Sequence, residues 1–324
     1  MSDVDELEAG VRDGDRRALA RAITLVESTR ADHREAAVEL LDRLVDRTGG
    51  ATRVGISGSP GVGKSTFIEA LGLEILRGGH RLAVLAVDPS SRRSGGSILG
   101  DKTRMVELGR EPDAYIRPSP AGETLGGVAR RTREALLLCE AAGFDVVLVE
   151  TVGVGQSETA VAELVDVFTL LVAPGGGDDL QGIKRGIMEL ADVVVVNKAD
   201  GDLEQTAGRT AADYRNALGL MRPRVAGIEP KVLTASALKG HGIDETWAAL
   251  CHVHDQLSGS GALDDLRRGQ AVAWMWSEVQ DAVIDAARRD GHAADRASRI
   301  EDEVADGRRT PTSGAREILR LMVR

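Results

Sequence analysis

The sequence predicts an α/β fold in which a mostly parallel central sheet is flanked by helices. Short apolar runs rich in β-branched residues recur through the middle of the chain, and longer stretches with helical spacing of apolar residues separate most of them. The runs are apolar throughout instead of alternating with polar residues, which indicates strands buried on both faces. Alternation of such strands with helices is typical of a parallel sheet covered on both sides.

The first elements of the chain are predicted to be helical. The stretches LEAGVRDGDRRALARAITLVES and REAAVELLDRLVDRTGG place apolar residues at helical spacing, and Gly49-Gly50 ends the pattern. The strands of the sheet are expected next, at Arg53–Ser57, Arg81–Val87, Phe144–Glu150, Val167–Val172, Val193–Asn197 and Val232–Ser236.

The pattern changes after about residue 257, where no further strand is predicted. Ser258-Gly-Ser-Gly261 is interpreted as a linker, and helices are expected at Leu263–Arg289 and near Ala315–Val323. The predicted organisation is an N-terminal helical segment over residues 1–50, a central α/β domain over residues 51–257 and a C-terminal helical arm over residues 258–324.

The bulk composition argues against some classes of function. The formal net charge is -10, which disfavours a general nucleic-acid binder or membrane-surface binder, since both need a basic face. No apolar run reaches the ~20 residues that a membrane-spanning helix needs, and the acidic N-terminus lacks a secretory signal. The two cysteines, Cys139 and Cys251, lie far apart, so a reducing cytoplasm is the expected location.

A glycine-rich turn follows the first predicted strand and precedes the helical run FIEALGLEIL. Its sequence, GSPGVGKS, is the pattern of a phosphate-binding P-loop, in which backbone N–H groups and a helix N-terminus converge on a triphosphate. The lysine is expected to contact the β- and γ-phosphates, and the final serine to bind Mg²⁺. We therefore expect a P-loop NTPase whose phosphate-binding residues are Gly58, Ser59, Pro60, Gly61, Val62, Gly63, Lys64, Ser65 and Thr66.

A second motif, Asn197-Lys-Ala-Asp200, lies at the end of a buried apolar run. The Asp200 carboxylate can accept hydrogen bonds from N1–H and the exocyclic amine of guanine, a donor pair that adenine lacks. Lys198 is expected along the base plane, and a backbone N–H from Ser236-Ala-Leu238 is expected at guanine O6. Selectivity for ATP is the alternative. Combined with the P-loop, the motif predicts GTP binding by Asn197, Lys198, Asp200, Ser236, Ala237 and Leu238.

Three acidic residues are candidates for binding Mg²⁺ together with Ser65, since this ion prefers hard oxygen ligands. Glu150 begins Glu150-Thr-Val-Gly153, which resembles the DxxG element of GTPases with Glu in place of Asp. Asp88 ends a predicted strand, and Asp101 lies in the Gly/Ser-rich loop that follows. Mg²⁺ keeps several waters, so not all three carboxylates need to bind at once, and each alone can also be read as a solvated loop carboxylate.

The predicted catalytic groups are Lys64, Glu150, Gly153 and Asp101. Positioning and electrostatic stabilisation by Mg²⁺, the lysine and backbone donors are expected to dominate, with the Gly153 N–H on the γ-phosphate. Gln156 lies near the position of a water-orienting residue but does not directly follow Gly153, as it does in Ras-like proteins. A slow intrinsic rate is therefore expected, with a partner completing the site.

Longer strings make a resemblance to one family specific. They are Val87-Asp-Pro-Ser-Ser91, Gly95-Gly-Ser-Ile-Leu-Gly-Asp101, Glu150-Thr-Val-Gly-Val-Gly-Gln-Ser-Glu158 and Asp178-Asp-Leu-Gln-Gly-Ile-Lys184. Together with the P-loop, the NKAD motif and the helical ends, they extend over nearly the whole chain. On these residues the chain resembles the MeaB/ArgK family of P-loop GTPases, also called methylmalonyl-CoA mutase-associated GTPases.

The resemblance implies a GTPase that converts GTP and water to GDP and phosphate and chaperones an adenosylcobalamin-dependent acyl-CoA mutase. Members gate cofactor loading, protect or reactivate the mutase, and typically form homodimers through a C-terminal helical arm. The resemblance also implies three switch segments, at Asp88–Arg104, Glu150–Ala162 and Ala173–Lys184. Asp178 and Lys184 become candidates for coupling to the mutase. Arg92-Arg93-Ser94 departs from the Pro/Phe/Thr-like stretch expected in the first switch.

Other functions stay open at this point. A nickel-delivering metallochaperone GTPase is expected to carry a His/Cys-rich segment, whereas the six His and two Cys here are scattered. A kinase of a transport-binding protein would need a protein acceptor site, and a nucleotide-dependent scaffold would bind GTP with little turnover. Cys251-His252-Val-His254 lacks the second ligand pair of a zinc site. Trp274-Met-Trp276 is interpreted as core or dimer packing on an amphipathic helix.

Overall fold

The computed structural model describes residues 3–87, 105–118, 125–151, 157–175, 185–289 and 291–322 of the chain. They belong to two compact units, Met1–Arg267 and Arg268–Arg324. Among the described residues, no helix is both long enough and apolar enough to cross a membrane.

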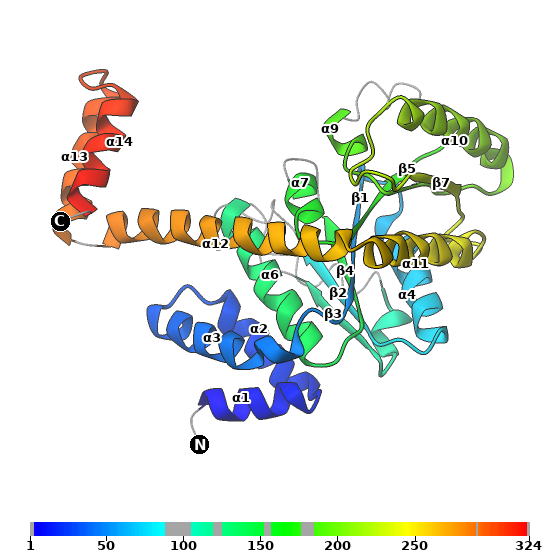
Figure 1. The fold of residues 1–324 in the computed structure, drawn as a ribbon, viewed down its shortest axis with the longest axis horizontal. Coiled ribbons are helices and arrows are strands. Elements are labelled where there is room, and N and C mark those ends of the chain that lie inside the picture. The colour runs from blue at the N-terminus through cyan, green and yellow to red at the C-terminus, as the bar shows by residue number, and fades with distance from the viewer. Residues whose placement is uncertain are drawn as a thin grey trace. The chain divides into compact units, whose positions relative to one another are not determined.

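The first unit is built on one parallel sheet, which confirms the predicted fold class (Figure 1). Its described strands lie in the order β3-β2-β4-β1-β5-β6-β7, and each neighbouring pair is parallel. The chain occupies one side of β1 first and the other side afterwards, so the strand order reverses at β1, where open α/β sheets bind their ligands. The strands are β1 (Thr52–Gly58), β2 (Leu82–Val87), β3 (Ala114–Pro118), β4 (Val146–Thr151), β5 (Val167–Val172), β6 (Val193–Val196) and β7 (Lys231–Thr234).

β3 is a strand that the sequence pattern did not predict. Its apolar part is limited to Ala114-Tyr-Ile116, and Arg117 and Pro118 follow at once. β3 lies at the edge of the sheet, paired only with β2, and an edge strand tolerates both proline and charge. Each of the six strands that were predicted overlaps an observed strand.

Helices cover both faces of this sheet. α4 (Lys64–Arg77) and α11 (Ile243–Ser260) contact each other and share one apolar core with the strands. α6 (Leu125–Ala141) and α7 (Ser157–Ala162) also contact each other, and both pack on β4. α10 (Glu204–Gly219) packs on β6 and β7, and the short α9 (Arg185–Met188) precedes β6.

Alternate residues of β1 show why both faces are covered. Val54 and Ile56 are fully buried in the core shared with α4 and α11. Gly55, between them, meets the opposite layer, where a Cβ atom would lie 2.9 Å from the Val165 side chain and 3.0 Å from Phe168. Only glycine fits at this close approach.

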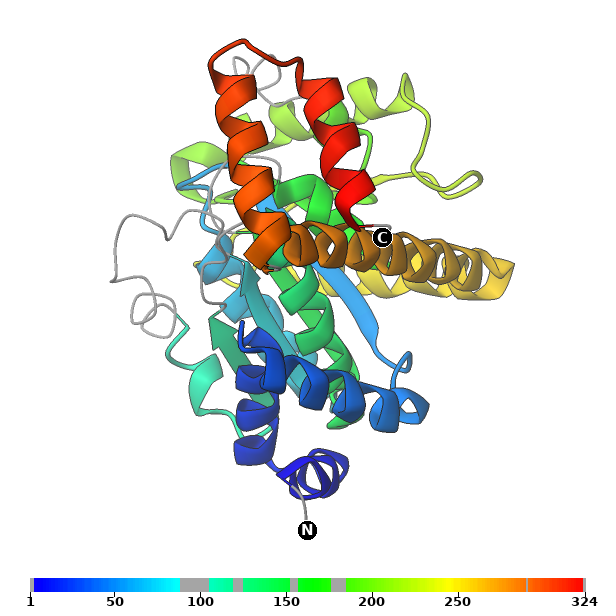
Figure 2. The same ribbon diagram turned by 90° about the vertical axis from the view of Figure 1, so that its left-hand side faces the viewer.

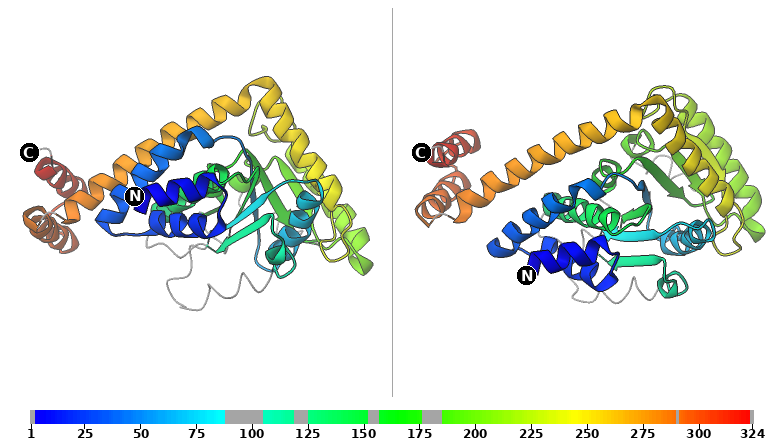
Figure 3. Two further views of the ribbon diagram at one scale, coloured as in Figure 1. Left: turned by 90° about the horizontal axis from the view of Figure 1, so that it is seen from below. Right: turned by 60° about the horizontal axis from the view of Figure 1, so that its bottom comes forward.

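The N-terminal helices form a layer against α6 (Figures 1 and 3). α1 (Asp3–Arg12), α2 (Arg16–Glu27) and α3 (Ala31–Leu44) each contact α6 and one another. The helical pattern of the sequence runs through the first two without a gap, but the chain breaks between them. Gly14 adopts a left-handed conformation, and Asp15 caps α2 by accepting hydrogen bonds from the N–H groups of Arg17 and Ala18.

A repeated contact joins the N-terminal ends of the strands. In each case an aspartate just before one strand accepts a hydrogen bond from a backbone N–H near the start of the neighbouring strand. The carboxylate thus provides an acceptor for an N–H group that the strand pairing leaves without one. The contacts are Arg81 N to Asp145 Oδ1 (2.7 Å), Arg53 N to Asp166 Oδ2 (2.9 Å) and Phe168 N to Asp192 Oδ2 (2.7 Å). Burial raises the pKa of the Asp192 carboxyl, and the adjacent Arg224 guanidinium opposes that shift.

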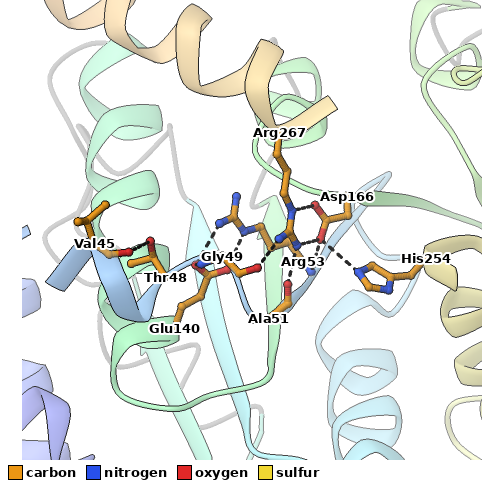
Figure 4. Close-up of polar contacts among 9 residues, drawn as sticks. All are labelled: Val45, Thr48, Gly49, Ala51, Arg53, Glu140, Asp166, His254 and Arg267. Atoms are coloured by element: carbon orange, nitrogen blue, oxygen red, sulfur yellow. Dashed lines mark hydrogen bonds and ion pairs between the residues drawn. The ribbon is translucent and has the colours of Figure 1, made fainter. Parts of the chain in front are cut away.

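Arg267, near the start of α12 (Ala262–Arg289), is hydrogen-bonded to residues at the N-terminal ends of the same strands (Figure 4). Its Nε and Nη2 donate to the two carboxylate oxygens of buried Asp166 at 2.8 and 2.7 Å. Its Nη1 and Nη2 also donate to the carbonyls of Gly49 (2.5 Å) and Ala51 (2.7 Å). A planar guanidinium can donate to both oxygens of a carboxylate and to further carbonyls at the same time. These contacts fix the start of α12 to the residues that precede β1.

The predicted linker at residues 258–261 is wrong as a linker. α11 continues through Ser260, and Gly261 ends it in a left-handed conformation directly before α12. A Gly/Ser-rich tetrapeptide has the same composition whether it forms a flexible link or a helix end with a glycine cap.

The second unit contains most of α12 together with α13 (Gly291–Ala305) and α14 (Pro311–Met322). α13 and α14 lie side by side (Figure 2). A Cβ on Gly314 would lie 3.0 Å from both Ile300 and Val304, so glycine permits this close packing. α12 and α14 were predicted from the sequence, whereas α13 was not, because its apolar positions are few and mostly alanine.

Candidate functional site

The turn between β1 and α4 lies at the carboxyl edge of the sheet, where the strand order reverses. β1 ends at Gly58 and α4 begins at Lys64. Gly63 precedes the helix in a left-handed conformation, and no described side chain caps it. The first N–H groups of α4 and the helix dipole therefore favour an anion at this place.

Two glycines of this turn are required by close approaches. A Cβ on Gly58 would lie 2.4 Å from the carbonyl oxygen of Leu171 in β5. A Cβ on Gly63 would lie 2.9 Å from Nδ2 of Asn197, and the φ of 93° at Gly63 is unfavourable for any other residue. Contacts with β5 and with the segment after β6 thus fix the backbone of the turn.

The second predicted motif is hydrogen-bonded directly to this turn. Asn197 Nδ2 donates to the carbonyl of Val62 at 2.9 Å, and Lys198 Nζ donates to the carbonyl of Gly61 at 2.7 Å. The buried Asn197 side chain also accepts a hydrogen bond at Oδ1 from the N–H of Ala237, at 3.2 Å. Three segments that are far apart in the sequence therefore meet at one place.

The backbone at Lys198 is strained. Its φ of 60° is the only positive value at a non-glycine residue among the described part of the chain. Such a conformation costs of order 1–3 kcal/mol and persists only where the surrounding structure holds it. Here the Nζ contact with Gly61 and the neighbouring Asn197 contacts hold it.

Asp200 is oriented by Ser236. The buried Ser236 hydroxyl donates to Asp200 Oδ2, and the N–H of Ala199 donates to the carbonyl of Ala235 at 2.9 Å. One contact leaves a carboxylate with further lone pairs that can accept from other donors. Leu238, two residues after Ser236, is 78% exposed, so this segment is open on its outer side.

Lys64 lies along the turn that it follows. Its Nζ donates to the carbonyls of Gly58 at 2.6 Å and Ser59 at 3.4 Å. Ser65 is half-buried and Thr66 is exposed in the first turn of α4. A compact positive charge, a hydroxyl and several N–H donors therefore lie within a few residues of one another, a set that can hold a polyphosphate.

Glu150 and Ser65 are the predicted metal-binding residues that the structure describes. Glu150 lies in β4, in register with Ile56 of β1 and Ala86 of β2, and is buried. Its carboxylate and the Ser65 hydroxyl are hard oxygen donors of the kind that Mg²⁺ prefers. The described residues contain no group of three or more His, Cys, Asp or Glu side chains that could hold a metal ion.

Several predicted site residues lie outside the described part of the chain. They are Asp88, Asp101, Gly153, Asp178 and Lys184, together with Gln156 and Arg92-Arg93-Ser94. Their roles stay predictions.

The contacts of Asn197 and Lys198 with the turn were missed by the sequence reasoning, which assigned both residues to the base. No local pattern signals them, because they depend on the order of the strands. Of the two interpretations of Trp274-Met-Trp276, core packing does not hold for Met275 and Trp276, which are exposed in the single chain, whereas dimer packing stays a prediction.

Comparisons with known proteins agree with this geometry. The family described as Methylmalonyl Co-A mutase-associated GTPase MeaB matches residues 19–292. A "Probable GTPase" of Mycobacterium tuberculosis is 56% identical over 98% of this chain and 95% of its own length. The mitochondrial "Methylmalonic aciduria type A homolog" of Mus musculus is 50% identical over 98% of this chain and 79% of its own length. The crystal structure of a LAO/AO transport system kinase matches with a TM-score of 0.77 and 38% identity, covering 99% of this chain and 98% of that one.

The family match takes in the turn after β1, the segment after β6 and most of the helices around them. The relatives are similar over nearly all of the chain, so the similarity is not limited to a common nucleotide-binding core. The chain belongs to the MeaB family of P-loop GTPases, and it is a GTPase.

Proposed function

We propose that this GTPase is a chaperone of an adenosylcobalamin-dependent acyl-CoA mutase of the methylmalonyl-CoA mutase type. Its nucleotide state gates cofactor loading and protection of the mutase. The observation that carries the proposal is the match over residues 19–292 to a family described as mutase-associated. Similarity that extends well beyond the turn over residues 58–66, here called the phosphate turn, supports a shared partner as well as shared chemistry.

In the proposed site, the phosphates of GTP lie against the turn over residues 58–66. Backbone N–H groups and the Lys64 ammonium hold the β- and γ-phosphates and oppose the charge that develops during hydrolysis. Guanine lies against Asp200, which accepts hydrogen bonds from N1–H and the exocyclic amine. Lys198 lies along the base, and the segment Ser236–Leu238 donates a backbone N–H to O6.

The donor set fits Mg²⁺. Ser65 and Glu150 supply a hydroxyl and a carboxylate, and Asp88 and Asp101 are proposed as further ligands. When bound, Mg²⁺ neutralises charge on the transferring phosphoryl group. The chain's own part is to hold Glu150 at the end of β4 and to present the Gly153 N–H to the γ-phosphate. Gln156 does not directly follow Gly153, so the sequence offers no obvious water-orienting residue; in this proposal intrinsic hydrolysis is slow, and the partner raises it.

Apolar side chains exposed along α12 support the proposal that the protein forms a homodimer through its C-terminal arm. They occur at helical spacing on one side of the helix and are between 36% and 57% exposed in the single chain. They are Val272, Met275, Trp276, Val279 and Val283. Aromatic residues and Met are enriched in the cores of protein interfaces, so a second copy of the same helix is the proposed occupant.

The proposed location is the cytoplasm. Cys139 and Cys251 both carry free thiols, which fits a reducing compartment. Neither a nickel-delivering GTPase nor a kinase of a transport-binding protein gains support from a contact among the described residues.

The decisive experiment mixes the purified GTPase with a purified adenosylcobalamin-dependent mutase. Phosphate release from GTP, co-elution of the two proteins, and transfer of adenosylcobalamin to the apo-mutase are measured with GTP, GDP and a non-hydrolysable GTP analogue. We expect binding that depends on the nucleotide, and phosphate release that is faster with the mutase than without it. A mutase that neither binds nor changes phosphate release under any nucleotide would overturn the chaperone proposal.

Coupling is tested by the ratio of phosphate release with and without mutase. Lys184→Ala and Asp178→Ala are expected to lower this ratio toward one. Lys231→Ala, an exposed lysine at the start of β7, is the matched control and is expected to keep the wild-type ratio. If all three variants keep the ratio, residues 173–184 do not transmit the nucleotide state.

A further inference from the structure

Two buried hydroxyl groups meet directly behind the phosphate turn. Thr151 Oγ1 donates to Ser57 Oγ at 2.9 Å, and both side chains are almost completely buried. Ser57 is the residue before Gly58, with which the turn begins, and Thr151 is the residue after Glu150. The bond therefore links the first strand of the phosphate site to the strand end that carries the proposed metal ligand.

The position of this pair in the sheet makes it a junction of three strands. β1 and β4 run in register up to Ile56 and Glu150, and the hydroxyl pair follows at the next position. On its other side, Thr151 is in register with Val87, the last described residue of β2. One threonine thus lies between the ends of two neighbouring strands, both of which lead into predicted nucleotide-contacting segments.

Packing alone does not explain the pair. The other inward positions of these strands are mostly Val, Ile and Leu, which fill such a core without a polar atom. Thr169 of β5, on the other flank of β1, is equally buried, yet its hydroxyl has no hydrogen-bond partner among the described residues. A hydrogen bond differs from apolar packing in that it fixes the distance and direction between two groups.

We propose that the Ser57–Thr151 hydroxyl pair is a positioning contact for GTP hydrolysis. It sets the separation between the phosphate turn and the end of β4, so that the turn and the Glu150 carboxylate act on one bound phosphoryl group. Neither Ser57 nor Thr151 contacts the reacting atoms. Both act through the residues that follow or precede them, and this role rests on the proposed binding of Mg²⁺ by Glu150.

The test measures GTP hydrolysis by Thr151→Val, Ser57→Ala and the double variant over a range of Mg²⁺ concentrations. Loss of a hydrogen bond of this kind changes an equilibrium constant roughly fivefold. We therefore expect kcat to fall about fivefold and the half-saturating Mg²⁺ concentration to rise by a similar factor. KM for GTP is expected to stay within about twofold, because the contacts with base and phosphates are retained. The double variant should be no worse than Thr151→Val, since the same bond is lost.

Two controls separate positioning from stability. Thr169→Val makes the same exchange in β5 without removing a hydrogen bond, and it is expected to keep the wild-type kcat and Mg²⁺ dependence. Thr151→Ser keeps the hydroxyl and is expected to restore both quantities. If Thr151→Val does not fold, Ser57→Ala removes the same bond from the other side.

Glu150→Gln distinguishes failure of this inference from failure of the metal assignment. If Glu150→Gln raises the Mg²⁺ requirement while Thr151→Val and Ser57→Ala change only the thermal midpoint, the positioning role is overturned and the metal assignment stands. If Glu150→Gln leaves the Mg²⁺ dependence at the wild-type value, the metal assignment and this inference both fail.

Discussion

At the scale of single residues, Asp200 is the side chain on which we propose that the choice of base depends. Its Oδ2 accepts a hydrogen bond from the Ser236 hydroxyl, which orients the carboxylate. Asp200→Asn replaces an accepting oxygen by a donating amine, so the exocyclic amine of guanine meets a donor, whereas xanthine carries a carbonyl at that position. We expect kcat/KM for GTP to fall about 100-fold or more, and kcat/KM for XTP to rise above its wild-type value.

Steady-state hydrolysis of GTP, XTP and ATP checks this expectation. Asp202→Asn, in the exposed turn η4 (Gly201–Leu203), makes the same exchange two residues away and should keep the wild-type preference. If kcat/KM for GTP falls and kcat/KM for XTP does not rise, Asp200 has a structural role through Ser236 instead of a role in recognising the base.

We expect Cys139 to make the stability of the fold sensitive to alkaline pH. Burial, and secondly the nearby Glu140 charge, raise the pKa of the Cys139 thiol. The native state therefore keeps its proton where the unfolded chain, with an ordinary thiol pKa of about 8.5, loses it, and stability falls as the pH rises above that value. From about pH 8 to about pH 10, wild-type protein should lose about 2 kcal/mol more unfolding free energy than Cys139→Ala.

Urea unfolding at several pH values measures this difference. Burial also raises the pKa of the half-buried Cys251 thiol, so Cys251→Ala should lessen the decline as well, but by less than Cys139→Ala does. Equal slopes for wild type and Cys139→Ala would show that the thiol is not the group responsible.

At the scale of elements, a buried ion pair joins α6 to the first strand. Arg53 Nε and Nη2 donate to the two carboxylate oxygens of Glu140 at 2.8 and 3.0 Å, and Glu140 also accepts from the N–H of Gly49 at 2.7 Å (Figure 4). The two side chains are 5% and 1% exposed. Glu140→Ala would leave a guanidinium buried without its counter-ion, so we expect the free energy of unfolding to fall by about 3–5 kcal/mol.

Chemical denaturation followed by circular dichroism tests the ion pair. Glu107→Ala is the matched control, because its pair with Arg110 is 67% and 72% exposed and should contribute less than about 1 kcal/mol. Similar losses in both variants would contradict the argument that burial makes the first pair costly to break.

The elements that the sequence predicted well are those specified by local patterns. The strand at Val193–Val196 is apolar throughout and buried on both faces, so its composition alone indicates it. β3 was missed because its edge position permits Arg117 and Pro118, and edge position is a property of the sheet and not of the segment. The break before α2 was missed because it depends on backbone conformation. Gly14 interrupts the helical pattern by adopting a left-handed conformation, and Asp15 begins α2 by capping it.

At the scale of the whole molecule, the sequence predicted segments that the structure brings together, but not the contacts that join them. The P-loop is recognisable because a strand, a glycine-rich turn and a helix follow one another in the chain. The bond from Asn197 to Val62 joins residues 135 positions apart and depends on the strand order β1-β5-β6. Alternation of strands and helices predicts a parallel sheet without fixing that order. The same reason explains why the Ser57–Thr151 pair, which depends on β1 and β4 being neighbours, has no sequence signal.

The assembly of the whole molecule can be tested at the exposed side of α12. Trp276 and Met275 are 57% and 53% exposed, and burying them against a second copy would remove apolar surface from water. Trp276→Asp puts a charge at the centre of that surface, so we expect the dimer dissociation constant to rise by about 30-fold or more. Sedimentation equilibrium measures the constant directly. Leu220→Asp, at a 90% exposed position of the first unit, makes a comparable exchange and should leave it unchanged. A wild-type protein that stays monomeric at high concentration would show that this side of α12 serves a different partner.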